Sequence, residues 1–299
     1  MEAVLSAVIP VFLVVGAAFV VRRAFNLDTR TLATLNIYLF IPALVFSSLS
    51  RSEVEWQLLG RFAAAAVLLM AINCGLLVLL ARARRMPPDL SSAFAMTAFP
   101  NLGNFGLPVV AFAFGREQGL PLAVVVMVCG AFLQNSVGVY LAQRSRYTMG
   151  RAFLRVFRFP MIYATVVALV FQRQGWGFPM ALSRAVDITA DAAIPVQLII
   201  LGLSIAETRL STDLDVFLAV GMRLIAGPIL AFGVARVIGL EGIALGAFTV
   251  QMSAPVAVGM AVYGVQFDVR PRFLSSVVAW SFILSVASVS VVLALLLAM

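Results

Sequence analysis

Two short stretches of this sequence combine residue types that can bind an anion in apolar surroundings. Residues 100–108 read PNLGNFGLP and interrupt an otherwise apolar segment, residues 91–114. Each proline removes a backbone donor and each glycine adds backbone freedom, so a regular helix cannot continue here. A second interruption, QMSAPVAVG, occupies residues 251–259. A helix that restarts after such a break presents unpaired N–H groups and the positive end of its dipole, about +0.5 charge. This arrangement favours recognition of a carboxylate.

The candidate substrate-binding residues are the polar and helix-breaking residues around these interruptions. Amide side chains supply donors without a permanent charge, and Pro108 and Pro255 suit the first position of a restarted half-helix. The expected binding residues are Asn101, Gly103, Asn104, Pro108, Gln134, Asn135, Gln251, Ser253 and Pro255. In the alternative interpretation, the two asparagines near the first break satisfy carbonyls that the break frees, and the other amides bridge neighbouring helices.

Two charged residues within apolar segments are candidates for ion coupling. Asp191 precedes Pro195 by about one helical turn, and an intramembrane carboxylate is a candidate for proton or cation coupling. It is only interfacial if its span begins near Arg184. Arg223 either pairs with a carboxylate or substrate, or extends to the cytoplasmic surface. We expect no cofactor, while coupling to H+ or Na+ stays open.

The composition indicates a membrane protein with many spans. Of the 299 residues, 63% are hydrophobic and 11% are charged, and the mean hydropathy is +1.06. A soluble domain has less apolar and more charged sequence.

All 21 basic residues are arginine and lie mainly between apolar segments, so the net charge of +8 indicates topology rather than nucleic-acid binding. With no histidine, and with Cys74 and Cys129 in apolar segments, neither a metal site nor a disulfide framework is indicated. No nucleotide-binding G-x-x-x-x-G-K motif occurs, so an enzyme is not expected.

Ten apolar segments are long enough to span a membrane. They lie near residues 3–21, 31–50, 57–81, 91–114, 119–142, 152–172, 185–206, 214–238, 241–265 and 273–298. Most of the arginines follow the odd-numbered segments or begin the sixth. By the positive-inside rule that side is cytoplasmic, so both termini are expected outside.

Two landmarks recur in the same order in the two halves. Ile41-Pro42 corresponds to Ile194-Pro195, and the two broken spans, the fourth and the ninth, also correspond. Because five spans is an odd number, the second half enters the membrane from the opposite side. The sequence therefore predicts an all-α membrane protein made of two inverted five-helix repeats, 1–148 and 149–299, in which spans 4 and 9 are broken and cross. Coincidence is the alternative, since proline is common in membrane helices.

Several motifs carry a resemblance to a known family. PNLGNFGLPVV at residues 100–110 closely resembles the fourth span of the auxin efflux carrier family, which includes plant PIN-type carriers and bacterial relatives such as malonate transporters. Further motifs look like its spans 8 to 10: RLIAGP at 223–228, GLEG at 239–242, QMSAP at 251–255, YGV at 263–265 and PRFLS at 271–275. The chain departs from the plant carriers in lacking their large central cytoplasmic loop and in the sequence of its ninth span.

The resemblance implies a carrier in which spans 1, 2, 6 and 7 form a scaffold and spans 3–5 and 8–10 form a moving, substrate-carrying bundle. It implies transport of small organic anions, carboxylates such as auxin or malonate, across the plasma membrane, here a bacterial inner membrane, by alternating access. It also implies a homodimer through the scaffold. The alternative is a membrane ligand sensor built on a transporter fold, although no signalling domain is visible in the sequence.

Overall fold

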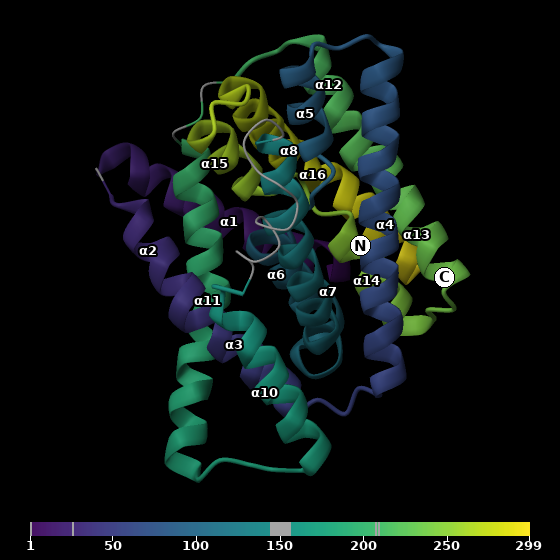
Figure 1. Ribbon diagram of the computed structural model, residues 1–299. Coiled ribbons are helices and arrows are strands. Elements are labelled where there is room, and N and C mark those ends of the chain that lie inside the picture. The colour runs from purple at the N-terminus through teal and green to yellow at the C-terminus, as the bar shows by residue number, and fades with distance from the viewer. Residues whose placement is uncertain (1, 26, 144–156, 207, 209) are drawn as a thin grey trace.

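The computed structural model describes residues 2–25, 27–143, 157–206, 208 and 210–299. These residues form α-helices and short π-helical turns, with a single isolated β-bridge (Figure 1). The helices of the first half are α1 (Glu2–Ala24), α2 (Thr29–Leu35), η1 (Asn36–Phe40), α3 (Ile41–Ser50), α4 (Trp56–Ala83), α5 (Pro88–Met96), η2 (Leu102–Gly106), α6 (Leu107–Phe114), η3 (Gly115–Gly119), α7 (Leu120–Leu133), η4 (Gln134–Gly138) and α8 (Val139–Ala142). Those of the second half are α10 (Pro160–Gln174), α11 (Met180–Ala206), α12 (Leu214–Gly221), η5 (Met222–Ala226), α13 (Gly227–Val237), α14 (Gly242–Met252), α15 (Val258–Gln266) and α16 (Pro271–Leu297).

Seven helical stretches of the described chain are long and apolar enough to cross a membrane. They are Val4–Ala24, Thr29–Ser50, Trp56–Ala83, Leu102–Ala142, Met180–Ala206, Leu214–Val237 and Pro271–Leu297. The longest of them runs from η2 through α8 and turns at η3, while α14 is apolar but shorter. The protein is therefore all-helical and crosses the membrane several times.

The two polar interruptions in the sequence are both breaks in helices. α5 ends at Met96 and η2 begins at Leu102, and α14 ends at Met252 and α15 begins at Val258. The first residues after α5 and α14 still donate to carbonyls of the preceding turn, but Pro100 and Pro255 have no N–H with which to continue the ladder of hydrogen bonds, so each helix ends. The prediction of a break in each of these two segments is confirmed.

Four of the five π-helical turns stand directly before a proline. Each of η1, η2, η3 and η5 leads into a helix whose second residue is proline: Pro42, Pro108, Pro121 and Pro228 respectively. The proline ring crowds the carbonyl four residues earlier and offers it no donor, and a wider π turn relieves this conflict without ending the helix. The helices therefore continue through these prolines and do not end at them.

The described helices pack as two groups. In the first group, which we call group one (α1, α2, η1, α3, α10 and α11), α1 packs along α11, and α3 packs against both α10 and α11. Group two comprises the remaining described helices, among which α4 packs on α5, α7 and α13, and α16 packs on α12, α14 and α15. The groups meet where α1 contacts α6 and where α11 contacts η2. In Figure 1 the connection from α10 to α11 lies at the bottom and α5, α12 and α15 lie near the top.

Candidate functional site

The two helix breaks cross and bind each other through their backbones. Pro100 and Val256 form an antiparallel bridge, in which the N–H of Asn101 donates to the carbonyl of Pro255 at 2.7 Å and the N–H of Ala257 donates to the carbonyl of Phe99 at 2.9 Å. Unpaired backbone groups cost several kcal/mol each in hydrocarbon, so broken helices persist only when buried in protein or beside a polar cavity. The bridge satisfies these groups and fixes the two breaks against each other.

Both helices restart at positions other than those expected from their prolines. Asn101 is the N-cap of η2, and its side-chain oxygen accepts from the N–H of Asn104 at 3.2 Å. Pro108 therefore lies within a helix that has already begun, and Pro255 lies in the unwound segment before Val258. The prediction that half-helices begin at the two prolines is wrong, because an asparagine side chain caps the first helix earlier and the second break uses the proline carbonyl as an acceptor.

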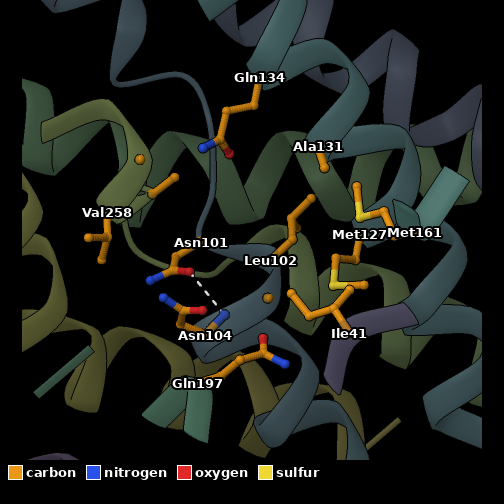
Figure 2. Close-up of a pocket in the computed structure, with 13 residues that line it drawn as sticks. Ile41, Asn101, Leu102, Asn104, Met127, Ala131, Gln134, Met161, Gln197 and Val258 are labelled. Atoms are coloured by element: carbon orange, nitrogen blue, oxygen red, sulfur yellow. Dashed lines mark hydrogen bonds between the residues drawn. The ribbon is translucent and has the colours of Figure 1, made fainter. Parts of the chain in front are cut away.

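A cavity of about 160 Å³ lies beside this crossing (Figure 2). It contains four of the expected binding residues, Asn101, Gly103, Asn104 and Gln134. The other residues that line it come from both groups: Ile41, Leu102, Met127, Ala131, Met161, Gln197, Ala257, Val258 and Gly259. The starts of η2 and α15 thus share one cavity, so the positive ends of both helices lie close to it.

The remaining expected residues lie outside the lining of this cavity. Gln251 is fully buried and its amide donates to the carbonyls of Ala123 at 2.9 Å and Leu102 at 3.3 Å. The amide of Asn135 donates to Ala131 at 2.7 Å, and its oxygen accepts from the hydroxyl of Tyr263. These contacts correspond to the helix-bridging alternative.

Ser253 and the two prolines also have structural contacts. The hydroxyl of Ser253 donates to the carbonyl of Thr249 at 2.6 Å, within the last turn of α14. Both prolines are buried, Pro255 in the crossing described above and Pro108 at the second position of α6. Their link to the cavity is indirect, since they shape the helices whose starts line it.

Gln197 lines the cavity and was not among the residues expected to do so. It lies on α11 two residues after Pro195, is fully buried, and neither its amide nitrogen nor its oxygen has a partner in the described chain. Figure 2 shows it beneath Asn104. The signal in the sequence was a lone amide in the apolar run AAIPVQLIIL, since a polar side chain in such a run is uncommon unless it has a partner or a function.

Arg223 joins the other ends of the two broken helices. It is 3% exposed, and its guanidinium donates to the carbonyl of Ala98 at 3.1 Å and to the carbonyl of Met252. These carbonyls lie at the C-terminal ends of α5 and α14. Each helix C-terminus carries about −0.5 charge, so the two together offset the charge of one arginine. Arg223 therefore neither pairs with a carboxylate nor extends to the cytoplasmic surface among the described residues.

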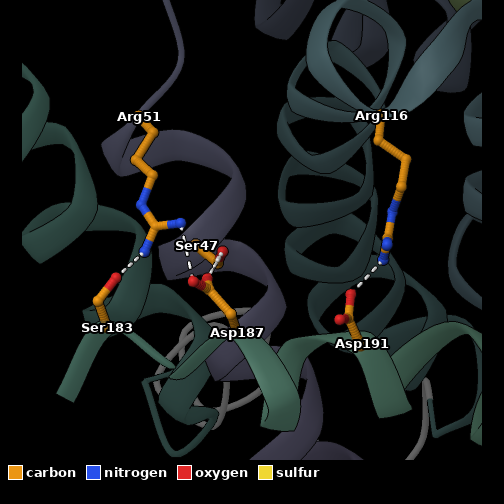
Figure 3. A network of polar contacts seen from close by, with 6 residues as sticks. All are labelled: Ser47, Arg51, Arg116, Ser183, Asp187 and Asp191. Carbon is orange, nitrogen blue, oxygen red and sulfur yellow. Dashed lines mark hydrogen bonds and ion pairs between the residues drawn. The ribbon is translucent and has the colours of Figure 1, made fainter. Parts of the chain in front are cut away.

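A larger cavity, about 960 Å³, lies toward the α10–α11 connection, between α3 and α11 of group one and η3, α7 and α14 of group two. Asp191 lines it and forms an ion pair with Arg116 of η3 at 2.7 Å, and Asp187 pairs with Arg51 at 3.0 Å (Figure 3). Asp191 lies about three turns into α11, and 61% of its side chain is exposed, at this cavity.

The Arg116–Asp191 pair connects the two groups. The other three ion pairs recorded for the described residues, Arg51–Asp187, Arg84–Asp215 and Asp89–Arg270, each lie within one group. Separation of group one from group two at this cavity therefore breaks the first pair and leaves the others intact.

We expect loss of the Arg116–Asp191 pair to favour opening of the larger cavity. In a background with Cys74 and Cys129 replaced by alanine, Asp191→Asn should speed thiol labelling of a cysteine at Ser48, a lining residue, by up to about fivefold, since exposed pairs contribute about 0.2–1 kcal/mol. The charge-swapped double variant, Arg116→Asp with Asp191→Arg, should restore the slower rate. Arg84→Gln, which breaks an exposed pair within group two, is the matched control. Equal labelling rates in all these variants would contradict the expectation.

Comparison with known proteins agrees with this architecture. The family model described as "Membrane transport protein" matches residues 3–150 and 144–293. An "Uncharacterized transporter" of Methanothermobacter thermautotrophicus is 28% identical over 272 residues, which is 87% of each chain. A protein of Rhizobium meliloti named "Putative malonate transporter" is 24% identical over 97% of this chain and 95% of its own. "Probable auxin efflux carrier component 1b" of Oryza sativa subsp. japonica is 25% identical over 139 residues, 44% of this chain and 25% of its own.

The family model covers nearly the full length, and the matched relatives are named as transporters or carriers rather than enzymes. The resemblance carried by the PNLGNFGLP stretch is thereby confirmed. The chain belongs to the auxin efflux carrier family of membrane transport proteins.

Proposed function

We propose that this protein is a secondary transporter of small organic anions, carboxylates in particular, and that it binds them in the cavity beside the helix crossing. The observation that carries the proposal is that two helix starts and the amides of Asn101 and Asn104 line one small cavity between the two groups. Helix starts of this kind bind carboxylates in other transporters. The relative named as a malonate transporter supports the same substrate class.

The lining of the cavity also supports a singly charged substrate. Among the described residues that line it, none is charged, so the attraction comes from helix dipoles and amide donors. Two helix starts at about +0.5 charge each match one carboxylate. Coupling to H+ or Na+ is compatible with this site, and Asp191 and Arg223 remain the proposed coupling residues.

We further propose ten spans in two inverted repeats, 1–148 and 149–299, of which residues 144–156 lie outside the described chain. The equivalent breaks and the antiparallel bridge between them support this arrangement. Group one corresponds to the scaffold and group two to the moving bundle. Since cavities lie on the boundary between the groups, alternating access is a movement of group two against group one. A homodimer through the scaffold remains a proposal from the family resemblance.

The proposed location is the plasma membrane, a bacterial inner membrane, with both termini outside. The arginine distribution supports this orientation, which places Gln118 and the larger cavity outside. In the cysteine-free background, a cysteine at Gln118 should react with a membrane-impermeant thiol reagent in intact cells, whereas one at Asp268, which is exposed at the other end, should be protected. The reverse pattern would refute the orientation.

Uptake into proteoliposomes tests the function. We expect the purified chain to move labelled malonate across the bilayer at mildly acidic pH, where most of the malonate carries a single charge, and to accumulate it when a proton or sodium gradient of the correct sign is imposed. Empty liposomes prepared in parallel give the background rate. Saturable binding of malonate with no flux above this background would favour the alternative of a ligand sensor. Absence of both binding and flux for small carboxylates would refute the proposal.

A further inference from the structure

The cavity contains more hydrogen-bonding capacity than a carboxylate can satisfy. Three buried side-chain atoms on its lining have no partner in the described chain: the amide nitrogen of Asn101, and both the amide nitrogen and the oxygen of Gln197. Buried polar groups are normally paired, and an unpaired one costs about 1–3 kcal/mol. Both Gln197 atoms are unpaired, so exchanging their assignment does not change the argument.

Gln197 lies at a close approach between the two groups. It comes from α11 of group one, while Gly103 belongs to η2 of group two. A Cβ atom on Gly103 would lie 2.9 Å from the Gln197 side-chain oxygen, so a side chain at this position would displace the amide. The amide is thus placed where a ligand bound at the start of η2 would contact both groups.

The unpaired atoms are two donors and one acceptor, and they identify the complementary ligand. A carboxylate accepts from the two donors but has no donor for the Gln197 oxygen. A hydroxyl or a protonated second carboxyl group on the same molecule supplies that donor. A second full negative charge would have no cation to pair with in this lining, and burying an unpaired charge is costly.

We propose that Gln197 is a specificity-determining residue, an inference that rests on the proposed function. It selects small monoanionic carboxylates that also carry a hydrogen-bond donor. Hydroxy acids and singly protonated dicarboxylic acids belong to this class. The cavity volume of about 160 Å³ limits the size of the ligand, since an apolar cavity of about 150 Å³ holds one benzene molecule. A simple alkyl carboxylate of equal size leaves the Gln197 oxygen unpaired and binds more weakly.

Lactate and isobutyrate test this proposal, because they differ by the replacement of a hydroxyl with a methyl group. Their affinities are measured by calorimetry on the full chain in detergent. The parent should prefer lactate at least about tenfold, as expected when a buried group is paired in one complex and unpaired in the other. Gln197→Met, which is similar in size but has no amide, should reduce this ratio to about one, mainly by weakening the binding of lactate. Gln174→Met, an exposed glutamine at the end of α10, should keep the parent ratio.

The melting temperature separates a binding role from a structural role. Without ligand, Gln197→Met should melt at or above the temperature of the parent, since it removes two unpaired buried atoms. A lower melting temperature with an unchanged lactate-to-isobutyrate ratio would show that the amide pairs with water or protein and would overturn the proposal. Equal binding of both acids by the parent would also overturn it. If the parent neither bound nor transported malonate, the proposed function would fail and this inference with it.

Discussion

Replacement of Arg223 by methionine should largely abolish folding or transport, because this side chain holds the ends of both broken helices. Its guanidinium donates to the carbonyls of Ala98 and Met252, which would be left unpaired in the interior. Each buried carbonyl left without a donor lowers the free energy of unfolding by about 1–3 kcal/mol. We expect a lower melting temperature in detergent, a lower yield of folded protein, and malonate uptake close to that of empty liposomes.

Two other variants make this test specific. Arg236→Met is the same chemical change at an exposed position of α13, and it should leave melting temperature and uptake near those of the parent. Arg223→Lys keeps the charge but has no planar fork of donors to reach two separate carbonyls. Its melting temperature and malonate uptake should therefore lie between those of the parent and those of Arg223→Met. If Arg223→Met behaved like Arg236→Met in both measurements, the capping role would be contradicted.

The helix breaks could be predicted from the sequence because they depend on local chemistry. Proline and glycine act on the backbone within one turn, so residues 100–108 and 251–259 were sufficient to locate both interruptions. The residues at which the helices restart could not be derived in this way. The first start depends on the cap formed by Asn101, and the second depends on backbone pairing with a segment more than a hundred residues away.

For the polar residues, too, the sequence predicts the local feature but not the long-range contacts. Amides near a break were identified, but the partners of Gln251 and Asn135 are carbonyls and hydroxyls on other elements, and sequence spacing does not reveal such contacts. Gln197 was missed because it stands alone on a different span, and only packing brings it to the cavity. The role of Arg223 depends on the convergence of two helix ends, which no local pattern encodes.

The second large effect is expected at Asn104, whose side chain lines the cavity at the third residue of η2. Asn104→Ala removes one donor to the substrate. A hydrogen bond to a charged group contributes about 1.5–3 kcal/mol, so malonate binding should weaken by about 10–150-fold. Asn104→Asp adds a negative charge next to the bound anion. Two like charges about 4 Å apart repel by about 4 kcal/mol at an effective dielectric constant of 20, which corresponds to roughly a thousandfold loss.

The aspartate variant also separates binding from folding. A negative charge in the first turn of a helix is favourable, typically by about 0.3–1 kcal/mol, which offsets part of the cost of an unpaired charge in this lining. Asn104→Asp should therefore melt near the temperature of Asn104→Ala while binding malonate far more weakly than Asn104→Ala. Calorimetry and melting temperature, measured on the same purified samples, give both quantities. An effect on folding alone would lower the melting temperature in both variants without this order of affinities. If the aspartate variant bound malonate as tightly as the parent, the substrate would have to lie away from the start of η2, and the site at the crossing would be wrong.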